Sequence, residues 1–127
     1  MRLAALYTGV GEESALHLAL ESGYASVDVL ARRAGSDRLL GLRDVGDLFA
    51  LGVDAVEELR SLAAGAPATA ESAHLRVAAP VRRPSKIVCV GLNYLAHIEE
   101  SGGTKPDRIV LFSKFPSSVV ELIGDGG

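Results

Sequence analysis

The chain has 127 residues, 48% of them hydrophobic and 23% charged, which is typical of a globular protein and excludes an intrinsically disordered one. Its formal net charge is −3 and it has no basic stripe, so we expect no nucleic-acid binding; no segment approaches the roughly 20 apolar residues that span a bilayer, so we expect no membrane anchor. Cys89 is the single cysteine and cannot form an internal disulfide, which favours a reducing, cytoplasmic location.

Three short apolar segments open the chain: Leu3–Thr8, Ala15–Leu20 and Ala25–Leu30. Glycines break the sequence between them. The second and third segments are separated by Glu21-Ser22-Gly23, a composition typical of a hairpin turn. The pattern predicts a small N-terminal sheet.

Two helices are predicted next, and we expect them to cover one face of this sheet. Asp44 and Asp47 have the residue types that begin a helical turn, and Gly52 can close it. Asp54 and Glu57 have the spacing of a capping box and precede apolar residues at helical intervals.

A connection from Gly65 to Ala73 is rich in Gly, Ala, Pro, Thr and Ser, which favours an exposed path with little to pack. We therefore predict two domains, residues 1–73 and residues 74–127. The combination of sheet and separate helices indicates an α+β fold.

The second domain begins with a strand that leads into a helix. Lys86–Gly91 is a β-branched run that predicts a buried strand. Asn93 can cap a helix from Tyr94 to Ser101, and Ile109–Phe112 predicts a further strand.

Three polar side chains of this predicted helix can share one face. Asn93, His97 and Glu100 are four and three residues apart. A glutamate beside an imidazole can fix its tautomer and stabilise the imidazolium, so His97 could act as a general base. The same spacing is also commonplace on solvated helices, and the pair by itself leaves both interpretations open.

Two longer segments resemble the fumarylacetoacetate hydrolase family. Residues 86–102 read Lys-Ile-Val-Cys-Val-Gly-Leu-Asn-Tyr-Leu-Ala-His-Ile-Glu-Glu-Ser-Gly, which is similar to the family's strand followed by an Asn-Tyr-x-x-His-x-x-Glu helix. Residues 111–118 read Leu-Phe-Ser-Lys-Phe-Pro-Ser-Ser, which resembles the next family signature. Residues 79–85 resemble the usual approach to the catalytic domain, and residues 1–73 resemble the family's variable N-terminal part.

The resemblance implies a metal-dependent hydrolase or isomerase that acts on a small 1,3-dicarbonyl or acylpyruvate-type acid. The reaction would be carbon–carbon bond hydrolysis, decarboxylation or keto–enol isomerisation, with Mg²⁺ or Mn²⁺ as cofactor. It assigns His97 and Glu100 to a catalytic dyad on a lid helix, and Asn93, Tyr94 and Lys114 to substrate binding. The fold it implies for residues 74–127 is the beginning of a mixed β-sheet domain.

The metal ligands of that family are a Glu-x-Glu pair and a later Asp, downstream of the Lys-x-Pro-Ser segment. No residues follow Gly127 to supply them, and neither Glu99-Glu100 nor Glu12-Glu13 is a credible substitute. We therefore expect no metal ligand in this chain and no activity from it alone. The alternatives are a non-catalytic binding or assembly module and a truncated reading of a longer gene, with a second copy or a missing C-terminal half as the partner.

Six polar residues also receive structural interpretations. Cys89 lies inside an apolar strand and is expected to be a buried, inert thiol. His17 and His74 have no partner at ligand spacing and are expected on the surface or in loops. Arg82-Arg83 is expected to be a solvated approach, and Lys114 could also project from a strand edge.

Overall fold

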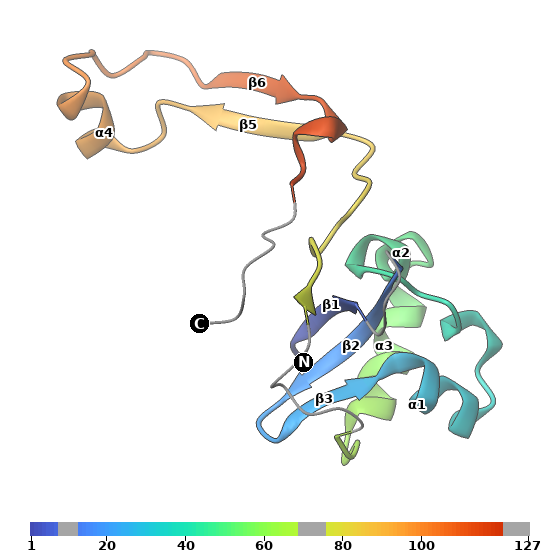
Figure 1. Ribbon diagram of the computed structural model, residues 1–127. Helices are drawn as coiled ribbons and strands as arrows, with labels where there is room; N and C mark the ends of the chain where they lie inside the picture. Colours follow the sequence, from blue (N-terminus) through green and yellow to red (C-terminus); the bar gives the residue numbers. More distant parts are fainter. Residues whose placement is uncertain (8–12, 69–75, 121–127) are drawn as a thin grey trace. The chain divides into compact units, whose positions relative to one another are not determined.

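The computed structural model describes residues 1–7, 13–68 and 76–120. The chain divides into an N-terminal unit, Met1–Arg82, and a hairpin unit, Arg83–Val119 (Figure 1). Both units contain helices and antiparallel strands, which confirms the predicted α+β class. The predicted domain boundary after residue 73 falls within residues 69–75, outside the described residues, and stays a prediction.

A four-stranded antiparallel sheet of order β3-β2-β1-β4 forms the centre of the N-terminal unit (Figure 1). Its strands are β1 (Leu3–Tyr7), β2 (Ser14–Leu20), β3 (Gly23–Ser26) and β4 (Arg76–Val77). The turn between β2 and β3 lies where the sequence predicts it, and Gly23 has a φ of 131°, a backbone conformation that glycine adopts without strain. Leu16 and Leu18, two residues apart in β2, point to the same face and are each 1% exposed.

The helices cover that face, as predicted, and make the core of the N-terminal unit (Figure 1). They are α1 (Val27–Ala34), α2 (Val45–Ala50), α3 (Val53–Ala63) and a 3₁₀ turn, Asp37–Leu39. Each contributes buried apolar side chains to one cluster with the two strand leucines: Leu16, Leu18, Ala25, Val27, Leu30, Ala31, Leu39, Leu42, Leu48, Ala55 and Leu59.

The third apolar segment of the sequence, Ala25–Leu30, is not the single strand that we predicted. It leaves the sheet at Ser26, whose side chain accepts a hydrogen bond from the Val29 backbone N–H and so caps α1. An apolar run of this length reads equally well as a strand or as the buried side of a helix, and the capping serine is what separates the two here.

The two later helices confirm one capping prediction and contradict the other. Asp44 is the N-cap of α2, and its side chain accepts from the Asp47 backbone N–H. The capping box at Asp54 is wrong, because α3 already begins at Val53, after Gly52, and has no side-chain cap. Gly52 has a φ of 90°, which turns the chain directly from α2 into α3 and leaves Asp54 inside the helix.

His17 is buried rather than on the surface. It is 3% exposed and lies in the central strand β2, where it pairs with Ala4 of β1 and Ser26 of β3. Its ring Nδ1 lies 2.9 Å from the Ala15 carbonyl oxygen, so a local contact satisfies one ring nitrogen. His74, the other histidine of that prediction, lies outside the described residues.

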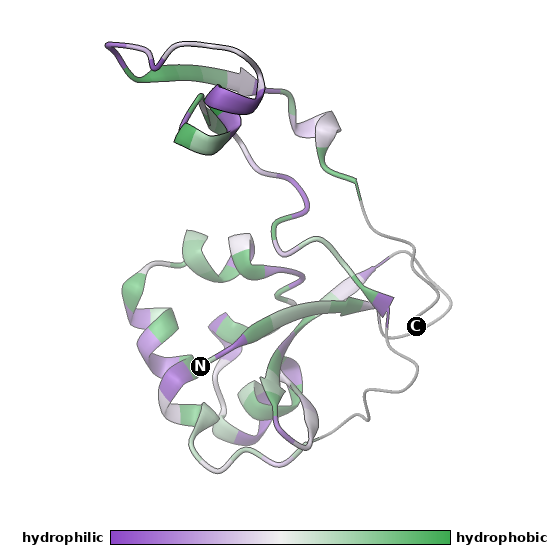
Figure 2. Ribbon diagram, turned by 90° about the vertical axis from the view of Figure 1, so that its left-hand side faces the viewer, coloured by the Kyte–Doolittle hydropathy of each residue, from purple (hydrophilic) through white to green (hydrophobic). Residues whose placement is uncertain are grey.

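The hairpin unit consists of two paired strands joined through a helix. β5 (Ile87–Gly91) and β6 (Val110–Lys114) are antiparallel, with α4 (Leu95–Glu100) between them in sequence, and a 3₁₀ turn, Pro116–Ser118, follows. Both predicted strands are confirmed, and Figure 2 colours much of this hairpin as hydrophobic. The burial predicted for Lys86–Gly91 is not found in the described part of the chain, since Val88 is 65% exposed.

Within residues 1–7, 13–68 and 76–120, none of the helices has both the length and the apolar character needed to traverse a bilayer.

Candidate acid–base site

A sharp backbone turn connects β5 to the candidate catalytic helix. Leu92 has a φ of 51° and is the only non-glycine among the described residues with a positive φ. A left-handed leucine is uncommon and carries strain, which is found most often at functional positions. The Gly91-Leu92-Asn93 step of the family-like segment therefore has a specific backbone role, namely to redirect the chain from strand to helix.

The predicted cap of this helix is wrong by one residue. The N-cap is Tyr94, with extended φ and ψ and no side-chain cap, and α4 begins at Leu95 rather than at Tyr94. The left-handed Leu92 places the next two residues outside the helix, so Asn93 cannot cap it. Asn93 consequently does not share a helical face with His97 and Glu100.

The predicted dyad is brought together, though loosely. His97 Nδ1 and Glu100 Oε2 lie 4.0 Å apart, with 70% and 84% of the two side chains exposed. This is an ion-pair distance rather than a hydrogen bond. A rotamer change of either side chain would close the gap, and the carboxylate could then hold one imidazole tautomer while the other ring nitrogen stays open to a reactant.

One apolar side chain anchors α4, which has only six residues. Ile98 is 2% exposed, whereas the residues around it in the helix are exposed. The carbonyl of Ile98 accepts from the Gly103 backbone N–H at 2.9 Å and from the Ser101 hydroxyl at 3.0 Å. Gly102 has a φ of 68°, so the chain leaves the helix just after its C-cap, Ser101.

Of the two remaining predicted residues, Tyr94 adjoins the dyad helix and Lys114 lies at the far end of the hairpin. Tyr94 is 74% exposed and stands just before α4. Lys114 pairs with Ile87, at the opposite end of the hairpin from the Gly91–Val110 pair that adjoins α4. Four residue steps along a strand are roughly 13 Å, so the structure does not bring Lys114 to the dyad.

No metal centre is formed by the part of the chain that the structure describes. Within it, no three side chains of His, Cys, Asp or Glu gather closely enough to hold an ion. A site for Mg²⁺ or Mn²⁺ needs several oxygen ligands around one point. The described residues of this chain therefore do not fit the metal that the resemblance implies, and no reaction step is derived through it.

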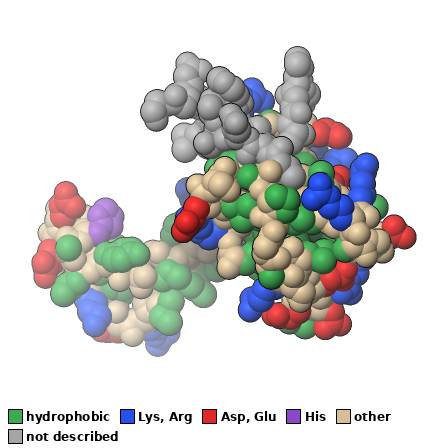
Figure 3. Space-filling view, turned by 90° about the horizontal axis from the view of Figure 1, so that it is seen from below, with side chains coloured by type: hydrophobic (Ala, Val, Ile, Leu, Met, Phe, Trp, Pro, Cys, Tyr) green, Lys and Arg blue, Asp and Glu red, His purple; other side chains and the backbone are tan. Residues whose placement is uncertain are grey.

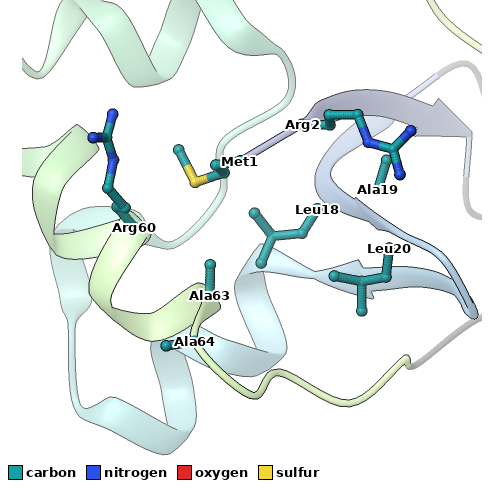
Figure 4. Close-up of a pocket in the computed structure, with 8 residues that line it drawn as sticks. All are labelled: Met1, Arg2, Leu18, Ala19, Leu20, Arg60, Ala63 and Ala64. Atoms are coloured by element: carbon teal, nitrogen blue, oxygen red, sulfur yellow. The ribbon is translucent and has the colours of Figure 1, made fainter.

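A separate pocket lies in the N-terminal unit, and none of the predicted site residues lines it (Figure 4). Its volume is about 260 Å³, and its walls are apolar except for Arg2 and Arg60, which lie on opposite sides of it. Arg60 also forms an exposed ion pair with Glu57 at 3.7 Å. No sequence pattern indicates this pocket, because its two arginines lie far apart in the chain and the remaining lining residues are Met, Leu and Ala, which form no recognisable motif.

Comparison with known proteins gives matches that agree with the motifs. No family model matches the chain. It is 44% identical over 61 residues to fumarylacetoacetate hydrolase domain-containing protein 2 of Pongo abelii, and 46% identical over 61 residues to the mitochondrial oxaloacetate tautomerase FAHD2A of Homo sapiens. A crystal structure of a putative HpcE protein from Mycobacterium smegmatis superposes with a TM-score of 0.63 at 29% identity.

These matches support the resemblance to the fumarylacetoacetate hydrolase family that the motifs indicate. Each of the two sequence matches covers 48% of this chain and 19% of the relative, and the structural match covers 93% of this chain and 37% of the other. The chain thus corresponds to a minor part of the family members that it matches. The names of these relatives indicate enzymes of the isomerase or hydrolase type.

Proposed function

We propose that this chain supplies the acid–base helix of a family enzyme that interconverts the keto and enol forms of a small oxo-dicarboxylic acid, with oxaloacetate as the first candidate. The observation that supports this most directly is the His97–Glu100 pair on α4, three residues apart at 4.0 Å and directly after the family-like strand and turn. Carbon–carbon bond hydrolysis or decarboxylation of an acylpyruvate-type acid proceeds through the same enol and remains the runner-up reaction.

In this proposal the His97–Glu100 pair transfers one proton during keto–enol interconversion. His97 would take a proton from the carbon next to the carbonyl and return it to the enol in the reverse direction, while Glu100 holds the ring orientation and stabilises the imidazolium. Tyr94 and Asn93, next to the dyad in sequence, and Lys114 are proposed to contact the substrate. Because both dyad side chains are exposed, this role requires that substrate or a further segment covers them and excludes water.

Mg²⁺ or Mn²⁺ is proposed as the cofactor of the longer enzyme, where it would supply a Lewis acid that stabilises negative charge. Its ligands are proposed to come from residues other than the described ones. The compartment is proposed to be the cytoplasm, on the basis of the single cysteine; the human relative FAHD2A carries a mitochondrial name.

The proposed dyad is tested by substituting His97 and by comparing the two adjacent glutamates of α4, Glu99 and Glu100. In a chain extended by the remaining residues of the Mycobacterium smegmatis relative, His97→Ala should lower kcat for oxaloacetate tautomerisation by about 10²–10⁴-fold, the usual contribution of a general base. Glu100→Gln should lower it less, whereas Glu99→Gln, with the same chemical change one residue away, should leave it near wild type.

The wild-type extended chain is the control for the enzymatic assignment. If it folds but turns over neither oxaloacetate nor acylpyruvates, the enzymatic proposal is wrong. Equal effects of Glu99→Gln and Glu100→Gln would remove the dyad from the mechanism.

The second candidate is an assembly module, and the exposed apolar hairpin favours it. Figure 3 shows apolar side chains on the surface of the hairpin unit. They come from β5, β6 and the turn before α4: Val88, Val90, Leu92, Val110, Leu111 and Phe112 are 40–65% exposed. We propose that further residues of a longer chain, or a second copy of this one, cover these strands. Light scattering of the 127-residue chain distinguishes a monomer from a self-associated form.

A further inference from the structure

The last residues before the hairpin unit are fastened to the N-terminal unit at three successive places. The Ala78 backbone N–H donates to the Ala5 carbonyl at 2.8 Å, and the Pro80 carbonyl accepts from the Val45 N–H at 2.9 Å. The Arg82 N–H donates to Asp44 Oδ2 at 2.8 Å. Residues 78–82 have no helical or strand partner of their own, so these three bonds define their path.

Asp44 uses both of its carboxylate oxygens in this arrangement. Oδ1 accepts from the Asp47 N–H at 3.1 Å and caps α2, while Oδ2 accepts from Arg82, which is 38 residues away in sequence. The residue is 7% exposed. Hydrogen bonds to an ionised, largely buried carboxylate are stronger than neutral ones and cannot be replaced by water without movement.

The neighbouring glycine leaves room for these contacts. A Cβ atom added to Gly46 would lie 2.9 Å from Asp44 Oδ1 and 3.1 Å from Cγ1 of Val81. Val81 belongs to the fastened segment itself. Any larger residue at position 46 would therefore displace both the Asp44 carboxylate and the Val81 side chain.

Aromatic stacking adds to the same attachment. Tyr7, which is 7% exposed, has the Arg76 guanidinium 4.7 Å and the Arg82 guanidinium 5.6 Å from its ring centroid. The expectation of a wholly solvated Arg82-Arg83 pair is thus wrong for Arg82, which is half-buried, and right for Arg83, which is exposed.

We propose that Asp44 is a latch that holds residues 78–82 against the N-terminal unit, so that the unfastened connection to the hairpin unit begins at the Arg82–Arg83 bond. One carboxylate then both starts α2 and fixes the approach to the family-like strand. The helix cap and the attachment of the connection are coupled through it.

Limited trypsin digestion of the 127-residue chain tests this at a single bond. Trypsin can cut between Arg82 and Arg83 but not between Arg83 and Pro84, and a backbone must leave its hydrogen bonds to enter the protease. Asp44→Ala should raise the initial cleavage rate at Arg82–Arg83, followed by mass spectrometry, at least roughly tenfold. Gly46→Ala should raise it as well.

Asp44→Asn separates the latch from general loss of stability. Asparagine keeps one acceptor oxygen and can satisfy only one of the two N–H groups, so its cleavage rate should lie between wild type and Asp44→Ala. Ser26→Ala is the matched control, because it removes the side-chain cap of another helix, α1, in the same unit. Unchanged cleavage in Asp44→Ala, or equal acceleration by Ser26→Ala, would overturn the proposal.

Discussion

Glu58 is a surface carboxylate that joins α3 to the segment before it. The Ser36 hydroxyl and then the Arg38 guanidinium hold the pKa of Glu58 below its ordinary value of 4.5. Arg38 also donates to the Asp54 carbonyl at 3.1 Å, so the same guanidinium reaches two turns of α3. Among the described residues, Glu58 is the group whose pKa is clearly shifted from its ordinary value.

The lowered pKa predicts a pH-dependent contribution to folding. A carboxyl whose pKa is depressed in the folded state stabilises the fold above its unfolded pKa and loses that effect as pH falls through the folded pKa. The difference in urea midpoint between wild type and Glu58→Gln should therefore be largest above about pH 5 and shrink at lower pH. A difference that grows on acidification would contradict the direction of the shift.

Leu59 is the neighbouring core position, 0% exposed in the cluster between sheet and helices. Leu59→Ala removes buried methyl groups and leaves a cavity, so it should lower the free energy of unfolding by about 2–5 kcal/mol. Leu51→Ala makes the same chemical change at a side chain that is 44% exposed and should cost much less. Urea denaturation of both variants measures the contrast, and equal losses would place Leu59 outside the core.

Single residues could be predicted from the sequence where the signal is local. Asp44 as a helix cap depends on neighbouring residues alone and was found. Asp54 and Asn93 failed as caps because the positive φ of Gly52 and Leu92 decides where each helix begins, and no residue pattern reveals that angle. The spacing of His97 and Glu100 predicted their proximity but could not give the 4.0 Å separation.

At the scale of elements, the β5–β6 hairpin has two apolar faces. The register places Cys89 with Phe112 on one face, and Val90 with Leu111 on the other. A strand that is apolar on both faces belongs inside a layered structure, which is why the sequence predicted burial. Among the described residues nothing covers Leu111, which is 61% exposed.

This exposure predicts self-association of the isolated chain. Leu111→Lys places a charge on the apolar face and should weaken concentration-dependent association, because a buried lysine is costly in any interface that forms there. Ser113→Lys adds the same charge on the same face at a position that is already polar, and should change association less. Sedimentation velocity over a concentration series compares the two, and identical behaviour would show that this face is not involved.

Most strands and helices could be predicted from the periodicity of apolar residues. The change from strand β3 to helix α1 within Ala25–Leu30 could not. The strands β1, β2, β5 and β6 and the helices α2 and α3 all lie in segments that the pattern marked. α1 was missed because Ala25–Leu30, in which Ser26 and Asp28 alternate with apolar residues, also suits a strand, and the chain turns from sheet to helix within it. The position of Lys114, at the end of the hairpin away from α4, depends on strand register, which a motif does not contain.

At the scale of the whole molecule, the two units differ in the size of their own apolar cores. The N-terminal unit has a continuous apolar core between its sheet and helices, while Ile98 is the one apolar side chain of the hairpin unit buried among the described residues. Backbone amides of β1 and β2 should therefore exchange with solvent far more slowly than those of β5 and β6 in the 127-residue chain. Hydrogen exchange with mass spectrometry checks this, and equal protection would indicate that the hairpin is already covered.

The reactivity of Cys89, the single thiol of the chain, can report whether one face of the hairpin is covered. Cys89 is partly exposed and stands beside Phe112, on the opposite face from Val90 and Leu111. An occupant that seals the Cys89 face should slow colorimetric titration of the sulfhydryl, whereas one that settles only on the Val90 face should leave labelling kinetics unchanged. The rate at which a thiol reagent labels Cys89 in the wild-type chain therefore indicates which face of the β5–β6 hairpin a partner covers.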